Sequence, residues 1–545
     1  MKLKHIAMAG ALLASSMSIQ SCTDFLEIDP LDAQTSDSFF KTSVEARQSL
    51  LGVYEKLRTD FRGTYIPMAM TADILSDDAY TGGGGPTDML MWQNMARFKP
   101  ETNNQVLLET WKKCYIGIQR ANTLLANYDN IAFKSNEEDL KNNYKGEAMF
   151  LRGHYYFELA RYFENVPLVL EPLQGDAWEG VTQATPQELY AAIAADMLAA
   201  IELMAEEMSE AEAGRLDKYA AKAELLKVYM FYTGVYQTAE TPVAGGSAIT
   251  KADAIAMADD VINNSGAVLE ADYADLFNGN GNYSQEVLFE IPFAATGSGD
   301  WGEWSYGNIQ SQMAGPRGHN SDLLAEGWGF GVPTHSLADS FEDGDARKAA
   351  TIMTAKDLID ATGKQVGVSY TYTGMFTNKY TTHKINYSDV NTPLNWAQNY
   401  HYIRLADIML IAAELNLDVA PAKALALVND VRSRAGLFGL TAVTLDDIYK
   451  ERRTELALEG HRYWDLLRRG VDYTASMVNV SNYELKAPVA ADDQYITDKG
   501  ENLTGDIGDA ASFEVNFKSE TRGFMPIPQE EIDLMGENIK QNAGY

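Results

Sequence analysis

Aromatic side chains gather in one glycine-rich stretch near the middle of the chain. Trp301, Trp304 and Tyr306 fall within six residues, interspersed with glycines. Flat rings on a loop can stack on the apolar face of a sugar ring, while planar polar side chains fix the hydroxyl groups. Because the stretch lacks helical or strand periodicity, we predict that these rings form an exposed stacking surface. The alternative is a loop that closes over a small hydrophobic cluster of its own.

A second stretch combines the same residue types around four consecutive glycines, residues 82–85. Asp78 and Tyr80 precede the glycines, and Trp92 and Asn94 follow them. The glycines interrupt any helix and let the chain turn freely, so we predict a second ligand-binding loop here. The alternative is a connector whose Trp92 is anchored in the core.

Catalytic motifs are missing from the sequence. It has no phosphate-binding P-loop, no Gly-x-Ser-x-Gly elbow and no His-Glu-x-x-His pair, and its seven histidines are scattered. Carboxylates are plentiful, so a glycosidase-type acid pair remains an open alternative. We expect a binding protein without catalysis or a cofactor; the sequence makes no prediction about metals.

Composition excludes further classes of function. The 545 residues carry a formal net charge of −33, which repels nucleic-acid phosphates and anionic lipid headgroups. Two cysteines, Cys22 and Cys114, cannot build a disulfide framework. Cys114 lies in a stretch that is expected to be helical, where we interpret it as an inert, partly buried thiol.

The N-terminus has the features of a secretory signal. Lys2 and Lys4 precede an uncharged stretch, residues 6–19, which is too short to span a bilayer. The pair Ser21–Cys22 then predicts cleavage after residue 21 and lipidation of Cys22. Gln20 departs from the lipobox pattern, which usually has a small residue at this position. The alternative is cleavage that leaves a free N-terminal cysteine. We expect the acyl chains to be the only membrane attachment. Residues 23–27 (TDFLE) look like a tether for export to the cell surface, and a periplasm-facing lipoprotein is the alternative.

Helix signals recur along the chain. Capping boxes, in which a Ser or Thr side chain and an acid or Gln three positions later cap each other's backbone N–H groups, are predicted at Thr42–Glu45, Thr102–Gln105, Ser135–Glu138, Thr185–Glu188, Thr250–Asp253 and Thr444–Asp447. Apolar stripes at spacings of three and four follow, for example from Ala148 to Phe163. Small residues mixed with aromatics in these stripes suggest closely packed, tetratricopeptide-like helix pairs.

The character of the chain changes after about residue 265. Pro167 ends a helix, residues 286–293 (EVLFEIPF) alternate like a strand, and residues 294–331 are rich in Gly and Trp. Helices resume near Tyr400. We predict a signal peptide (1–21), a helical N-terminal region (22–265) and a C-terminal region with loops, short strands and a ligand face (266–545). Trp328 and Phe330 are expected in the core.

Charged residues also recur at helical spacing in the C-terminal region. Arg404 and Asp407 are three apart, as are Glu459 and Arg462, and Arg462 and Asp465. Such neighbours can form ion pairs along a helix surface, so we interpret them as structural rather than catalytic.

Several segments together resemble the SusD/RagB family of outer-membrane nutrient-binding lipoproteins. They follow the family's order and span nearly the whole chain: CTDFLE (22–27), EAMFLRGHYYF (147–157), RYFENVP (161–167), YIRLADIMLIAAE (402–414), NDVRSRAG (429–436), ERRTEL (451–456), EGHRYWDL (459–466), PIP (526–528) and QNAGY (541–545). One departure is Ala543, where the family pattern has Pro.

The resemblance implies a mainly α SusD-like fold with tetratricopeptide-like helix pairs and a loop-rich ligand face. It also implies a cell-surface lipoprotein that captures oligosaccharides and delivers them to a SusC-like TonB-dependent transporter. Two alternatives remain: capture of peptides or protein fragments by the same fold, and a surface hydrolase. The sequence does not identify the glycan.

Overall fold

The computed structural model describes residues 39–58, 67–209, 212–296, 306–390, 392–479 and 515–545. The predicted signal peptide, Cys22, Trp301 and Trp304 therefore lie outside the described residues. Most of what is described is helical, and the strands are short and form two-stranded sheets.

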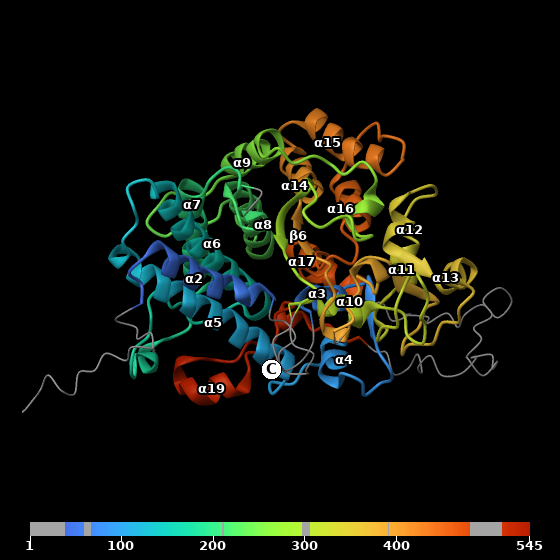
Figure 1. Cartoon of the computed structure of the whole chain (residues 1–545), viewed down its shortest axis with the longest axis horizontal. Helices are drawn as coiled ribbons and strands as arrows, with labels where there is room; N and C mark the ends of the chain where they lie inside the picture. The colour runs from blue at the N-terminus through green and yellow to red at the C-terminus, as the bar shows by residue number, and fades with distance from the viewer. Residues whose placement is uncertain (1–38, 59–66, 210–211, 297–305, 391, 480–514) are drawn as a thin grey trace, which may run out of the picture.

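Helices build the N-terminal region, as predicted. Its α-helices are α2 (Ser43–Tyr54), α3 (Met68–Ile74), α4 (Leu90–Ala96), α5 (Gln105–Asn127), α6 (Glu138–Phe163), α7 (Pro186–Leu203), α8 (Lys218–Tyr236) and α9 (Lys251–Asn264). The long helices pack in sequence, α5 on α6, α6 on α7 and α7 on α8 (Figure 1).

The C-terminal region mixes helices with short strands, and among the described residues the strands form three antiparallel pairs, one of which takes β1 from the N-terminal region. Its α-helices are α10 (Ile309–Ala314), α11 (His335–Ala338), α12 (Arg347–Thr351), α13 (Ala355–Thr362), α14 (Leu405–Asn416), α15 (Pro421–Arg434), α16 (Leu445–Glu455), α17 (Arg462–Arg469), α18 (Val471–Val478) and α19 (Gln529–Met535). The pairs are β1 (Ala79–Gly82) with β3 (Phe330–Pro333), β2 (Val287–Ile291) with β6 (Tyr400–Arg404), and β4 (Ile352–Thr354) with β5 (Met375–Thr377). The predicted strand at residues 286–293 is thus confirmed as β2.

Four of the six predicted capping boxes are confirmed, at Thr42, Thr185, Thr250 and Thr444. The other two predictions are wrong. Asn104, not Thr102, caps α5, because its Oδ1 atom accepts the Val106 N–H at 2.9 Å. The helix α6 begins at Glu138 without a side-chain cap.

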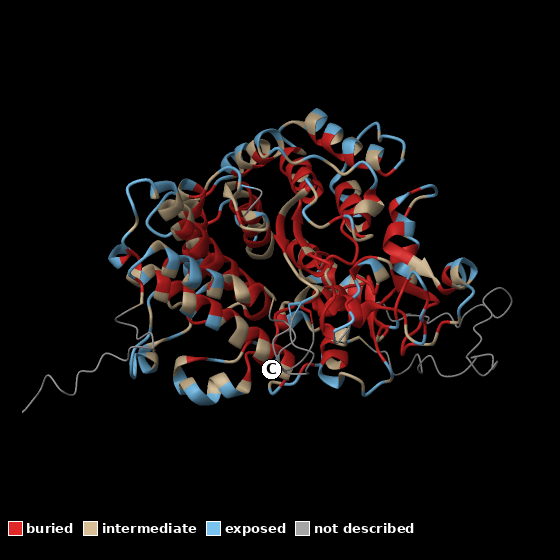
Figure 2. Ribbon diagram, in the orientation of Figure 1, coloured by how far each residue is buried: buried red, intermediate tan, exposed pale blue. Residues whose placement is uncertain are grey.

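The helix α6 forms the centre of the helical half, and its predicted apolar stripe is buried (Figure 2). Close approach to α5 depends on Gly117, since a Cβ atom there would lie 2.4 Å from the Tyr155 ring. Tyr155 in turn donates its hydroxyl proton to the Val53 carbonyl of α2 at 2.7 Å. Small residues therefore bring these helices together, as the sequence suggested.

Charged residues of the C-terminal region form a buried cluster. Arg404, which ends β6, contacts Glu459 at 2.8 Å and Glu455 at 2.9 Å and also pairs with Glu286. Lys379 reaches Glu459 at 2.7 Å. Burial raises the pKa of Glu459, but Arg404 and Lys379 outweigh burial and lower it to about 2. The cluster joins segments that are far apart in the sequence.

The predicted pairs at a spacing of three are wrong for these residues. Arg404 belongs to a strand, and Asp407 pairs instead with Arg452 of α16 at 2.7 Å. Arg462 binds Asp77 at 2.8 Å, and Asp465 binds Arg452 at 3.0 Å. The interpretation of the charges as structural still fits, because all these partners are buried.

Candidate functional site

The first predicted binding loop is largely internal. Asp78 and Trp92 are fully buried, and Tyr80 is 7% exposed. The Trp92 indole N–H donates to the Thr71 hydroxyl at 3.2 Å, and its ring lies 5.6 Å from that of Phe330. The expectation that these three side chains stand on a surface loop is therefore corrected, and the alternative, Trp92 anchored in the core, describes the structure.

Arginines from the far end of the chain explain the burial of the acidic pair. Arg453 of α16 binds Asp78 at 2.7 Å, and Arg462 of α17 binds Asp77 at 2.8 Å. These ion pairs fasten the segment after α3 to the C-terminal helices. Burial raises the pKa of Asp78 against the opposing effect of Arg453. Both aspartates thus serve the fold.

The run of glycines forms a turn that is tied to its neighbours. Gly83 donates its N–H to the Gly329 carbonyl at 2.8 Å, and its φ of 89° favours glycine. A Cβ atom on Gly83 would lie 2.5 Å from the Phe330 ring. Gly84 is exposed, and Asn94 of the predicted site is half-buried on the following helix. Asn94 stays a predicted contact of this loop.

Tyr306 of the second predicted loop lies at the surface, with 37% of its area exposed. Its backbone is held by two hydrogen bonds, from the Ala294 N–H to the Tyr306 carbonyl at 2.7 Å and from the Tyr306 N–H to the Thr296 carbonyl at 3.1 Å. The Arg58 guanidinium lies 5.0 Å from the centre of the Tyr306 ring.

A second exposed tyrosine is connected through Trp396 to the chain that follows Tyr306. Tyr387, 38% exposed, packs its ring 5.7 Å from that of the buried Trp396. The backbone carbonyl of Trp396 accepts the N–H of Asn308 at 2.8 Å, and Asn308 lies two residues after Tyr306. Lys384 places its ammonium group 4.8 Å from the centre of the Tyr387 ring. We call these four residues, Arg58, Tyr306, Lys384 and Tyr387, the tyrosine face.

The tyrosine face combines stacking rings with charged hydrogen-bond donors. Tyrosine rings offer a flat apolar surface and a hydroxyl group, and the two cations offer several N–H donors. Sequence reasoning identified Tyr306 and missed Arg58, Lys384 and Tyr387. For Tyr387 the only local signal is an aromatic residue in a polar, strand-poor stretch, and the position of Arg58 follows from tertiary structure.

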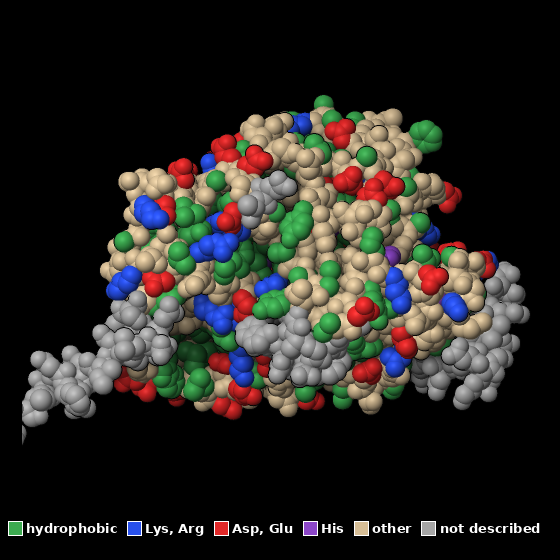
Figure 3. Space-filling model, viewed as in Figure 1, with side chains coloured by type: hydrophobic (Ala, Val, Ile, Leu, Met, Phe, Trp, Pro, Cys, Tyr) green, Lys and Arg blue, Asp and Glu red, His purple; other side chains and the backbone are tan. Residues whose placement is uncertain are grey.

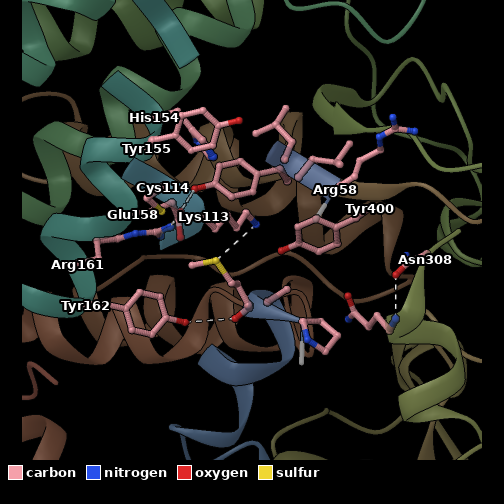
Figure 4. Close-up of a pocket in the computed structure, with 18 of the residues that line it drawn as sticks. Arg58, Lys113, Cys114, His154, Tyr155, Glu158, Arg161, Tyr162, Asn308 and Tyr400 are labelled. Atoms are coloured by element: carbon pink, nitrogen blue, oxygen red, sulfur yellow. Dashed lines mark hydrogen bonds and ion pairs between the residues drawn. The ribbon is translucent and has the colours of Figure 1, made fainter. Parts of the chain in front are cut away.

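A narrow cavity lies between the two halves, next to Arg58. Its walls come mainly from α5, α6, α8, residues 291, 293 and 308–310, and the start of α17 (Figure 4). About 60 Å³ is open to water-sized molecules. This space is enough for ordered water, because about 10–15 Å³ of such volume holds one water molecule.

Ionisable groups line this cavity and bind one another. Lys227 donates to the His461 Nδ1 atom at 3.0 Å and lies 3.4 Å from Asp407. Burial, and then the charge of Lys227, lowers the pKa of His461 to about 3. His154 Nδ1 lies 2.7 Å from a Glu224 carboxylate oxygen. These contacts connect α6 to α8, and connect α8 to α14 and to the residue just before α17.

Two further features bear on the class of protein. Among the described residues, no group of three or more His, Cys, Asp or Glu side chains is arranged to hold a metal ion. In the same part of the chain, no helix has the length and apolar character needed to cross a membrane.

Comparison with known proteins identifies relatives along nearly the whole chain. Residues 353–545 match the model of the SusD family, and residues 24–230 match a family described as starch-binding, associating with the outer membrane. A SusD-like protein of Formosa agariphila is 25% identical over 547 residues, which cover 90% of this chain and 96% of the relative.

Solved structures share the fold over the same length. A laminarin-binding SusD-like protein is 30% identical, with a TM-score of 0.77, and the alignment covers 93% of this chain and 100% of that one. Surface glycan-binding protein A from Bacteroides thetaiotaomicron is 25% identical with a TM-score of 0.76, over 93% of this chain and 100% of that one. The mainly α, SusD-like fold is thus confirmed, and the chain belongs to the SusD/RagB family.

Proposed function

We propose that this protein captures oligosaccharides at the cell surface without changing them chemically. Membership of the SusD family supports this proposal, as does the similarity to a laminarin-binding relative over 93% of the chain. The glycan is held on the tyrosine face, where its rings stack on Tyr306 and Tyr387. Trp301 and Trp304 remain predicted contacts of the adjoining loop.

The pairing of Tyr306 with Arg58 is the structural observation that carries this proposal. An exposed ring beside a guanidinium provides both the stacking surface and the hydroxyl-binding donors that a neutral sugar needs. We expect an exposed site of this kind to bind at micromolar to millimolar strength, which corresponds to about 4 to 8 kcal/mol.

Calorimetric titration against a panel of oligosaccharides, laminarin fragments first, tests the proposal. We expect Tyr306→Ala to weaken binding about three- to ten-fold, since an aromatic contact contributes roughly 0.5–1.5 kcal/mol beyond its buried area. Phe438→Ala is the matched control, because Phe438 is 96% exposed on the distant loop between α15 and α16. If Tyr306→Ala and Phe438→Ala bind the glycan with equal affinity, the tyrosine face is not the glycan-binding site.

Peptide capture is tested with the same instrument. If extended peptides from a library bind to the protein and no glycan of the panel does, the peptide alternative replaces the proposal. Release of shortened products from any glycan would instead identify a hydrolase.

Two parts of the proposal concern the cell surface. Cys22 carries the lipid that holds the protein on the outer membrane, and a SusC-like TonB-dependent transporter receives the glycan. Cys22→Ser should move the protein from the membrane fraction to the soluble fraction. The native protein should co-purify with such a transporter in mild detergent. Purification of the protein without a transporter would contradict the partnership.

A further inference from the structure

An apolar groove crosses the helical half of the molecule, away from the tyrosine face. One wall is a single face of α5, another is the chain after α6, and the third is α19, which lies beside α5 in Figure 1. The open volume is about 540 Å³. Its lining is Trp111, Lys112, Tyr115, Ile116, Gln119, Arg120, Pro167, Val169, Leu173, Trp178, Val181, Glu531, Leu534 and Met535.

Aliphatic side chains stand unusually exposed in this groove. Ile116, Leu173 and Leu534 come from the three different walls and are 43%, 39% and 60% exposed. Exposed apolar surface gathered in a hollow marks a binding site more often than scattered exposed residues do. Figure 3 shows hydrophobic side chains recessed above the acidic residues at the lower left of the molecule.

Two polar side chains in the wall of the groove are already paired. The Tyr115 hydroxyl donates to the Pro167 carbonyl at 2.7 Å, and the Trp111 side chain hydrogen-bonds Glu531. A sugar hydroxyl buried against these paired groups would lack a partner, which costs free energy. The groove therefore selects an apolar occupant.

The two ends of the groove are marked by cations of α5. Lys112 and Arg120 are eight residues apart, which corresponds to about 12 Å along the helix. An extended alkyl chain of about ten carbons has this length. Arg120 is held by Glu55 at 2.8 Å and by the Gly52 carbonyl. Among the ion pairs of the described residues, Lys112 pairs with Glu530 at 3.3 Å, and the two side chains are 43% and 67% exposed. The charge of Lys112 also acts on Glu531, the next residue along α19.

Such an exposed ion pair contributes little free energy, so Lys112 can exchange Glu530 for another anion. From these observations we infer that the groove binds a medium-chain fatty acid, with its alkyl chain along α5 between Trp111 and Leu534 and its carboxylate at Lys112. No bond is made or broken. This site is separate from the proposed glycan site and does not depend on it.

Chain length provides the first test. The mature protein is made in soluble form as the variant Cys22→Ser. It is titrated with fatty-acid carboxylates of eight, ten and twelve carbons, each below its critical micelle concentration. We expect one site, and about fifteen-fold tighter binding for each two methylenes added, because each buried methylene contributes ~0.8 kcal/mol. The gain should stop once the chain exceeds the groove. Affinity that is independent of chain length, or no heat of binding at millimolar dodecanoate, would overturn the inference.

Variants provide the second test. Ile116→Glu places a charge in the groove and should weaken dodecanoate binding at least ten-fold, whereas Val268→Glu, at a 53% exposed position outside the groove, should not. Lys112→Ala should weaken binding of dodecanoate but leave binding of dodecanol unchanged. Glycan binding should be unaffected in all three variants, which also shows that they fold. Equal dodecanoate affinity in the two glutamate variants would place the ligand elsewhere and overturn the assignment.

Discussion

Removing Arg404 tests whether the buried charges depend on one another. Arg404 is 1% exposed and contacts three carboxylates, those of Glu286, Glu455 and Glu459. The variant Arg404→Met keeps much of the side-chain volume but leaves these acids with less positive charge. Breaking a buried ion pair by removing one partner costs about 3–5 kcal/mol, because a desolvated charge is left behind.

The expected change in melting temperature follows from the size of the chain. At ~2.1 cal/mol/K per residue, unfolding 545 residues has an entropy near 1 kcal/mol/K, so this loss lowers the melting temperature by about 3–5 °C. Differential scanning calorimetry at pH 7 measures it. Lys356→Met is the matched control, because Lys356 and Asp360 are 54% and 64% exposed, and such a pair contributes under ~0.5 kcal/mol. A loss below ~1 °C for Arg404→Met, equal to the control, would refute the reasoning.

Two further predictions concern packing and pH. Gly117→Ala should lower the melting temperature by about 1–3 °C, since the new methyl meets the Tyr155 ring, whereas Gly52→Ala, with open space around it, should raise it slightly. His461 stays neutral when folded because its pKa is about 3, so only the unfolded chain gains a proton as the pH falls below ~6.5. Stability should therefore fall by up to ~1.4 kcal/mol per pH unit between pH 6 and 4, and less in His461→Gln; identical slopes would contradict this assignment.

Local signals in the sequence predicted much of the helical structure. The capping boxes at Thr185 and Thr444 involve residues three apart, so no knowledge of the fold is needed to find them. The apolar stripe of α6 likewise follows from helical periodicity. The cap of α5 was misplaced because Asn104 lay closer to the true start of the helix than Thr102.

The candidate site was harder to predict, because tertiary contacts decide which aromatics are exposed. Trp92 and Tyr306 both sit near glycines in the sequence, yet Trp92 is buried against Phe330 while Tyr306 lies at the surface. Asp78 is bound by Arg453, which is 375 residues away. Nothing local to Asp78 indicates that partner.

A crystal structure of the protein with a bound oligosaccharide, chosen as the tightest ligand of the panel, tests the central claim most directly. We expect the sugar rings to lie on Tyr306 and Tyr387, with Arg58 or Lys384 within hydrogen-bonding distance of their hydroxyl groups. A glycan bound at any other surface, with the tyrosine face empty, would contradict the account.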